Sequence, residues 1–134
     1  MSILDAHETI RTRFVTIIED PGSLSVQHDN MEYAKPENQL WCRFTILTGG
    51  KNRRSIGSAV SRYRNFGIAT AQLFSPIGLG EKVQMTLADL INDTFISVAV
   101  DGVIFQTPKI IKMGRIGSEW QINVDCPFYF DTLE

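Results

Sequence analysis

The sequence predicts a single α+β domain, with a mixed or antiparallel β-sheet and two main α-helices packed on one face. Two segments carry apolar residues at helical spacing, and the segments around them alternate apolar and polar residues as strands do. Their order is helix, several strands, helix, then more strands, without an internal repeat. The chain has 134 residues, which is long enough for one domain, residues 1–134, with its own hydrophobic core.

The composition is that of an ordinary globular protein, with 43% hydrophobic and 21% charged residues. A net charge of -2 argues against a dedicated nucleic-acid-binding protein, which usually has a strong basic excess. A membrane span is not expected, because the chain lacks a run of about 18 apolar residues. The N-terminal segment carries acids early and does not resemble a secretory signal. Cys42 and Cys126 lie among alternating apolar residues, which favours buried thiols and folding in a reducing cytoplasm.

The N-terminal part of the chain predicts a helix over residues 3–19. Ser2 can cap its start, and Asp20-Pro21-Gly22 is expected to end it. A short strand follows over residues 24–28, and the polar stretch 29–38, broken by Pro36, is expected to be a loop. The apolar residues at helical spacing are Ile3, Ala6, Ile10, Phe14, Ile17 and Ile18.

Two strands are expected next, over residues 40–47 and from about Val60 to Ser75. Residues 48–57 join them, and their glycines and basic residues predict a long, mobile hairpin loop. One face of the second strand carries small residues, which would let a helix pack closely over the sheet. These residues are Gly67, Ala69 and Ala71.

A second helix is predicted over residues 79–94, followed by strands over residues 96–100 and 103–105 around a turn at Asp101-Gly102. A strand over residues 108–115 then turns back at residues 116–119. The apolar stripe expected to pack the helix on the sheet comprises Leu79, Val83, Leu87, Leu90 and Ile91.

The final strand, residues 120–131, has the clearest alternation in the chain. Pro127 cannot donate a ladder hydrogen bond, so an edge or a bulge is expected there. The face predicted to be buried comprises Trp120, Ile122, Val124, Cys126, Phe128 and Phe130.

The segment Gly78–Val83 lies between a strand and a helix, where phosphate-binding loops also occur. It offers one G-x-G, an acid at Glu81 where phosphate would lie, and neither Ser nor Thr after Lys82. Val83 also takes the place of the third glycine of a dinucleotide fingerprint. We therefore expect a plain strand-to-helix turn and no cofactor.

Catalytic and metal-binding patterns are not found in the sequence. His7 and His28 belong to no metal-ligand spacing and are expected at the surface or in a loop. A nucleophile elbow is absent, and Asp89 and Asp93 are more simply a solvated helix face. We expect no enzymatic activity, no catalytic residue and no metal ligand.

Basic residues cluster around the first hairpin, where five of the thirteen Lys and Arg residues lie. Such a cluster is either a solvated loop or a docking surface for an acidic partner or a nucleic-acid backbone. The residues taken as candidates are Lys51, Asn52, Arg53, Arg54, Arg62 and Arg64.

Four landmarks follow one another in the second half of the chain: an F-x-P-x-G-x-G turn after a basic strand, a helix rich in Ala, Asp and Leu, a Thr-Pro strand, and a final W-x-x-N-V-x-x-P-F strand. They are carried by Phe74, Pro76, Gly78, Gly80, Ala88, Asp89, Thr107, Pro108, Trp120, Asn123, Val124, Pro127 and Phe128. With the amphipathic N-terminal helix, this ordered set resembles the tail terminator-like proteins of lambda-like and other long-tailed bacteriophages and prophages. The resemblance covers roughly residues 1–131.

The resemblance implies a structural virion protein that forms a ring, expected to be a homo-hexamer, at the head-proximal end of the phage tail. Such a ring stops polymerisation of the major tail tube protein and offers a surface to the head–tail connector. Phage DNA passes through its lumen without sequence-specific binding, and assembly takes place in the cytoplasm of the bacterial host. The basic loop over residues 48–57 could line this channel or dock on the next ring, although no motif of the resemblance covers it.

Two alternatives stay open. A related head–tail joining protein, of the neck or tail-completion type, would carry similar landmarks. A small-ligand-binding α+β domain would instead need convergent polar groups in a pocket near Gly78–Lys82.

Overall fold

The computed structural model describes residues 1–54 and 61–134, and it confirms the α+β fold. The helical elements are α1 (Ile3–Phe14), the π-helical segment η1 (Val15–Glu19), α2 (Asp20–Gly22) and α3 (Lys82–Phe95). The strands are β1 (Ser25–His28), β2 (Trp41–Arg53), β3 (Arg62–Pro76), β4 (Ala99–Val100), β5 (Val103–Phe105), β6 (Lys109–Ile116) and β7 (Glu119–Leu133).

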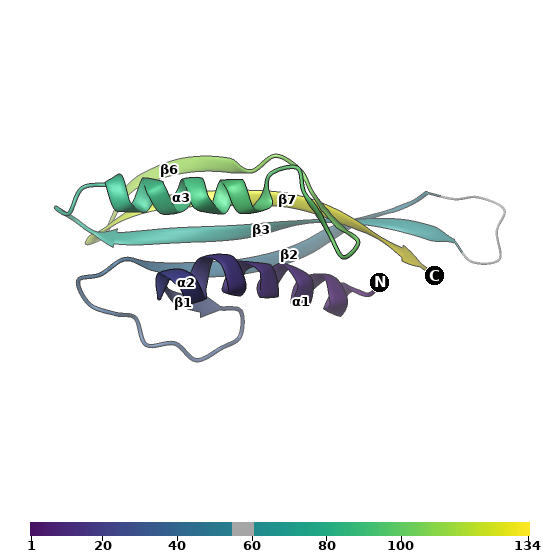
Figure 1. Cartoon of the computed structure of the whole chain (residues 1–134), viewed down its shortest axis with the longest axis horizontal. Helices are drawn as coiled ribbons and strands as arrows, with labels where there is room; N and C mark the ends of the chain where they lie inside the picture. Colours follow the sequence, from purple (N-terminus) through teal and green to yellow (C-terminus); the bar gives the residue numbers. More distant parts are fainter. Residues whose placement is uncertain (55–60) are drawn as a thin grey trace.

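The strands form one mixed sheet in the order β1-β2-β3-β7-β5-β4, and β6 also pairs with β7. β1 runs parallel to β2, and the other described pairs are antiparallel. Both helical segments cover the same face of the curled sheet, the one toward the viewer in Figure 1. A hydrogen bond from Arg13 Nε to the Thr94 carbonyl (2.9 Å) joins the two helices.

The core lies between the helices and this face of the sheet. Residues that pair across β2, β3 and β7 form rows on this face. In one such row Phe44, Ala71 and Val124 lie side by side, and all three are buried. Phe14 of α1 stacks on Phe44 with ring centroids 4.0 Å apart, which fixes the N-terminal helix over β2. The alanines of β3 are buried beneath the helices, so the expected close packing over small residues is confirmed.

The N-terminal helix begins as expected but ends later. Ser2 caps it through a reciprocal pair of hydrogen bonds with Asp5. The helix does not stop at residue 20, because α2 carries it through Pro21 to Gly22. Ser23 ends it in the left-handed conformation (φ 50°), and the Leu24 amide donates to the Glu19 carbonyl. The missing amide hydrogen of Pro21 is tolerated in the first turn of α2.

The expected buried face of α3 was only partly correct, because Ile91 is buried and Leu87 packs against the core while other members of the stripe do not. Val83 and Leu90, which were assigned to the buried stripe, are exposed, whereas Gln84 is 1% exposed. The Gln84 side-chain amide donates to the carbonyls of Leu73 (2.8 Å) and Trp120 (2.9 Å). With Gln84 bonded to two strand carbonyls, α3 turns Ala88 and Phe95 to the core together with Ile91, the residue of the expected stripe that is fully buried.

The hairpin between β2 and β3 is longer than expected. Residues 48–53 are not loop, because β2 continues through Arg53 in register with β3. A register shift between Thr48 and Gly50 marks an irregularity where the loop was predicted to start. The rest of the predicted loop, Ser55–Gly57, and the predicted strand start at Val60 lie outside the described residues.

The alternation of β7 is confirmed, because Ile122, Val124, Cys126, Phe128 and Phe130 are buried. The expected edge or bulge at its proline is not found. β7 is a central strand, and its register with β3 runs continuously past Pro127. On its other side β6 pairs up to Asp125 and β5 pairs from Phe128, so Pro127 lies at the change of partner, where a missing donor is tolerated.

Both short turns are confirmed. Asp101 (φ 47°) and Gly102 (φ 87°) join β4 to β5, and positive φ at both residues is the signature of a type I′ hairpin. Gly117, also at positive φ, turns β6 into β7.

Candidate functional site

The basic residues singled out in the sequence lie together on an extension of the sheet. We call residues 48–54 and 62–66 the basic arm. In Figure 1 the ends of β2 and β3 that carry it extend beyond the N-terminus of α1. Lys51 pairs with Asn65, Asn52 with Arg64, and Arg53 with Tyr63. β7 continues the pairing on the other side of β3, from Phe66 with Tyr129 to Arg62 with Leu133, so the described arm is an ordered part of the three-stranded centre of the sheet.

Strand alternation divides these candidates between two faces. Lys51 shares a cross-strand row with Asn65 and Phe130, which are buried, so Lys51 and Arg53 project on the helix side. Asn52 and Arg64 share a row with Asp131 on the outer side of the sheet. Arg54 and Arg62 also lie on the outer side, joined by a hydrogen bond from the Arg54 amide to the Arg62 carbonyl.

The outer side of the arm carries a dense ion-pair network. Arg64 donates from Nε and Nη2 to the two carboxylate oxygens of Asp131, at 2.9 and 3.2 Å. Arg62 reaches the same carboxylate at 2.9 Å, and the Arg64 guanidinium lies 4.4 Å from the Tyr129 ring centroid. The hydrogen bonds from Arg64 hold the pKa of Asp131 below its ordinary value, although partial burial opposes this.

The helix side of the arm has a second ion pair. The Lys51 ammonium lies 2.5 Å from a carboxylate oxygen of Glu134 and 5.3 Å from the Tyr63 ring centroid. The hydrogen bond from Lys51 lowers the pKa of Glu134. Sequence reasoning missed both acids, because they lie far along the chain from the basic residues. The alternation predicted for the last strand, which puts Asp131 on the face opposite the buried residues, was the signal available for one of them.

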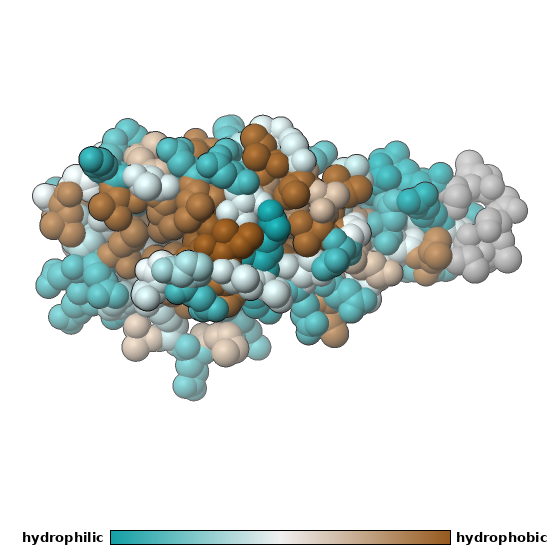
Figure 2. All heavy atoms as spheres, viewed as in Figure 1, coloured by the Kyte–Doolittle hydropathy of each residue, from teal (hydrophilic) through white to brown (hydrophobic). Residues whose placement is uncertain are grey.

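An apolar groove lies in the helix layer and was not expected. We call it the α3 groove. It has a volume of about 780 Å³ and runs between α3 and the end of the N-terminal helix. Figure 2 shows hydrophobic residues gathered on this face, between α3 and the segment η1–α2. Its apolar walls are formed by Ile17, Ile18, Pro21, Leu24, Leu40, Val83, Leu87 and Leu90.

The strand-to-helix turn at residues 77–81 is a structural element, as expected from the sequence. Gly78 (φ 97°) and Gly80 (φ 75°) adopt a conformation that favours glycine. Glu81 is held by the Lys112 ammonium (2.8 Å) and the Trp120 indole N–H (3.1 Å). These hydrogen bonds, the one from Lys112 above all, lower the pKa of Glu81. The Glu81 carboxylate therefore ties the turn to β6 and β7.

The histidines are half-buried rather than fully exposed, and neither lies in a loop, because His7 belongs to α1 and His28 to β1. His7 Nε2 lies 2.9 Å from the Thr48 hydroxyl, and His28 Nε2 lies 2.7 Å from Glu19. His28 also makes edge contacts with Phe14 and Phe44. Within residues 1–54 and 61–134, His, Cys, Asp and Glu side chains form no group of three that could hold a metal ion.

The cysteines are free and buried, as predicted. Burial raises the pKa of Cys126 to about 12 and raises that of Cys42 further, which keeps both thiols protonated and unreactive. Among the helices of the described residues, none is long and apolar enough to cross a membrane.

Comparisons with known proteins bear on the fold. No family model matches the chain, and no curated protein matches it. Twelve chains of solved structures match. One of them superposes with a TM-score of 0.64 at 15% identity, covering 92% of this chain and 94% of the other, and its name states no activity. At this identity the likeness extends to the fold alone.

Proposed function

We propose that this chain is a structural subunit of the phage tail terminator type. Copies of it form a ring, expected to be hexameric, on the head-proximal end of the tail tube of a phage or prophage. The ring stops addition of the major tail tube protein and offers its other surface to the head–tail connector. Phage DNA passes through the lumen.

The ordered set of landmarks carries this proposal, because their residues hold the fold together at positions far apart in sequence. Phe74 stacks on Trp41 with ring centroids 4.3 Å apart. Trp120 anchors the glycine turn through Glu81, and Phe128 lies in the core. These three landmark residues therefore make contacts that link β2, β3, the glycine turn and β7.

The surfaces also support an assembly subunit. The exposed α3 groove provides apolar area of the kind found at protein–protein contacts. The basic arm projects from the domain, where it can reach a neighbouring ring or the backbone of DNA in the lumen. Neither role requires a catalytic group.

A small-ligand-binding domain finds less support. A hollow of about 370 Å³ lies beside Ile77, Glu81 and Trp120. Glu81 is already engaged by Lys112 and Trp120, so its carboxylate is not presented to a ligand.

Electron microscopy of tails assembled with and without this protein tests the proposal. Without the protein, we expect tubes of irregular, extended length that do not join heads. Tubes of unchanged length that join heads normally would refute the proposal. Tubes of normal length that fail to join heads would favour the alternative, a neck or tail-completion protein.

A further inference from the structure

Two apolar surfaces of this chain are exposed on opposite sides of the sheet. The first is the α3 groove in the helix layer. The second, which we call the outer sheet patch, lies on the face away from the helices, because its residues alternate with core residues along β2, β3 and β7. The outer sheet patch comprises the cross-strand rows Leu47, Ile68, Pro127 and Phe66, Tyr129, Ile104.

The exposure of large side chains on both surfaces is high. Val83 is 72% exposed and Leu90 is 43% exposed in the groove, and Leu47 and Ile68 are 67% and 44% exposed in the patch. Scattered apolar residues are common on protein surfaces, but contiguous groups mark interaction sites.

The orientation of α3 makes its exposed stripe informative. A helix at the surface of a domain normally turns its apolar stripe to its own core. Here Ala88, Ile91 and Phe95 face the core, and a second set of apolar residues, Val83, Leu87 and Leu90, lines the groove. The sequence therefore places apolar residues on an exposed surface of α3 in addition to those that form the core.

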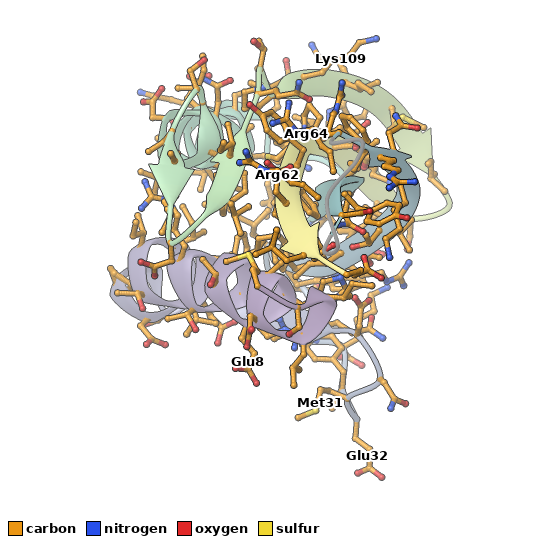
Figure 3. The ribbon with its side chains drawn as sticks, turned by 90° about the vertical axis from the view of Figure 1, so that its right-hand side faces the viewer. Glu8, Met31, Glu32, Arg62, Arg64 and Lys109 are labelled. Carbon is orange, nitrogen blue, oxygen red and sulfur yellow. The ribbon has the colours of Figure 1, made fainter. Side chains whose placement is uncertain are left out.

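The charges around the two surfaces are of opposite sign. Lys82 is a charged residue in the lining of the groove. Three exposed acids adjoin lining residues along the helices: Asp20 precedes Pro21, Asp89 precedes Leu90, and Asp93 lies one turn after Leu90. Around the patch the basic residues Arg43, Arg62, Arg64 and Lys109 outnumber the acids Asp125 and Asp131 on the same face. Figure 3 shows Arg62, Arg64 and Lys109 on the side away from α1, well separated from Glu8 on α1 and from Glu32 in the loop after β1.

We propose that the outer sheet patch of one copy of this chain docks into the α3 groove of the next copy. Because the two surfaces are different and lie on opposite sides of the sheet, the contact is head-to-tail, and repetition of such a contact closes a ring when the rotation per subunit allows it. The opposite charges of the two rims orient the encounter. This inference rests on the proposed function for the claim that copies associate, and it adds which surfaces meet.

The test uses two purified full-length variants. The groove variant carries Val83→Asp and Leu90→Asp, and the patch variant carries Leu47→Asp and Ile68→Asp. Each keeps one surface intact, so each is expected to be a monomer by sedimentation velocity under conditions where the wild-type chain associates. Mixed together, they should form a one-to-one dimer and nothing larger, because only one intact contact is possible between them.

The matched control variant carries Leu4→Asp and Met31→Asp, two residues that are each 66% exposed and outside both surfaces. It should associate like the wild-type chain. Circular dichroism and thermal melting verify that the variants fold, and if either fails, the serine versions replace the aspartates. These should weaken self-association by roughly tenfold or more.

Other outcomes overturn the inference. A patch variant that still associates by itself indicates a groove-to-groove contact, and a mixture that gives only monomers removes the pairing of the two surfaces. A wild-type chain that stays monomeric at millimolar concentration also overturns it. Tail length distinguishes failure of this contact from failure of the proposed function. If tails assembled with the groove variant still have the normal length, the protein terminates tails without the patch-to-groove contact.

Discussion

Arg64 and Asp131 lie directly opposite each other on β3 and β7 and form a two-bond ion pair, with N–O distances of 2.9 and 3.2 Å. The pair ties the β3 strand of the basic arm to β7 on the outer side of the sheet. It also places a carboxylate between Arg62 and Arg64, which would otherwise repel each other. The arm thus combines a high density of positive charge with a fixed geometry.

The Asp131→Asn variant should change how stability depends on pH. In the folded chain, hydrogen bonds from Arg64 lower the pKa of Asp131, so its ionised form stabilises the fold above the ordinary pKa of about 3.9. This contribution is lost as the pH falls below about 4 and through the lowered pKa. Chemical denaturation should therefore show a difference between wild type and variant that is largest at neutral pH and shrinks in acid. Arg64→Gln should behave alike, and parallel pH curves for wild type and Asp131→Asn would contradict this account.

The Gly67→Ala variant should destabilise the sheet. An added Cβ at Gly67 would lie 2.4 Å from the Leu47 carbonyl oxygen and 2.5 Å from Cζ of Phe128. The backbone of β2 must shift to admit it, and we expect a loss of about 1–3 kcal/mol in the free energy of unfolding. Gly49→Ala is the control, because an added Cβ there meets nothing within 4 Å. Equal urea midpoints for the two variants would show that the close contact of Leu47 and Phe128 with Gly67 does not contribute to stability.

The Gln84→Ala variant should also destabilise the chain, by about 1–3 kcal/mol, because it leaves two strand carbonyls without their donor. Thr86→Ala, an exposed change on the same helix, should cost less than about 1 kcal/mol. Urea denaturation of both variants measures the difference. If Gln84→Ala is as stable as Thr86→Ala, the hydrogen bonds do not set the orientation of α3.

Replacing Lys51, Arg53 and Arg54 by Ser should leave the fold intact, because all three side chains are exposed. We expect assembly of tails or their joining to heads to be impaired, and phage yield measures this. A second variant that exchanges Lys and Arg at the same positions keeps the charge and should retain most of the yield. A normal yield from the serine variant would remove the arm from the proposed function.

The sequence predicted the elements whose own pattern decides their structure. The alternation in β7, the cap at Ser2 and the Asp101-Gly102 turn are local signals, and the structure confirms each of them. The basic cluster was also located correctly, since its residues lie on one arm.

The errors arose where distant residues decide the outcome. Gln84 was missed as a buried residue because its partners, Leu73 and Trp120, are set by the tertiary fold. Residues 48–53 read as a loop by composition, yet pairing with β3 draws them into the sheet. The division of the arm into two faces likewise depends on the register of β2, β3 and β7, which no local pattern specifies.

The long register between β3 and β7 has a consequence for how the chain folds. Their pairs run from Pro76 with Glu119 to Arg62 with Leu133, so the centre of the sheet is built from contacts between segments distant in sequence. Such contacts require large loops to close before they add stability, which places this chain in the slow regime of two-state folding, on the order of milliseconds to seconds. During synthesis, one edge of β3 stays unpaired until β7 has been made. A chain interrupted before β7 would therefore expose that edge to pairing with other chains.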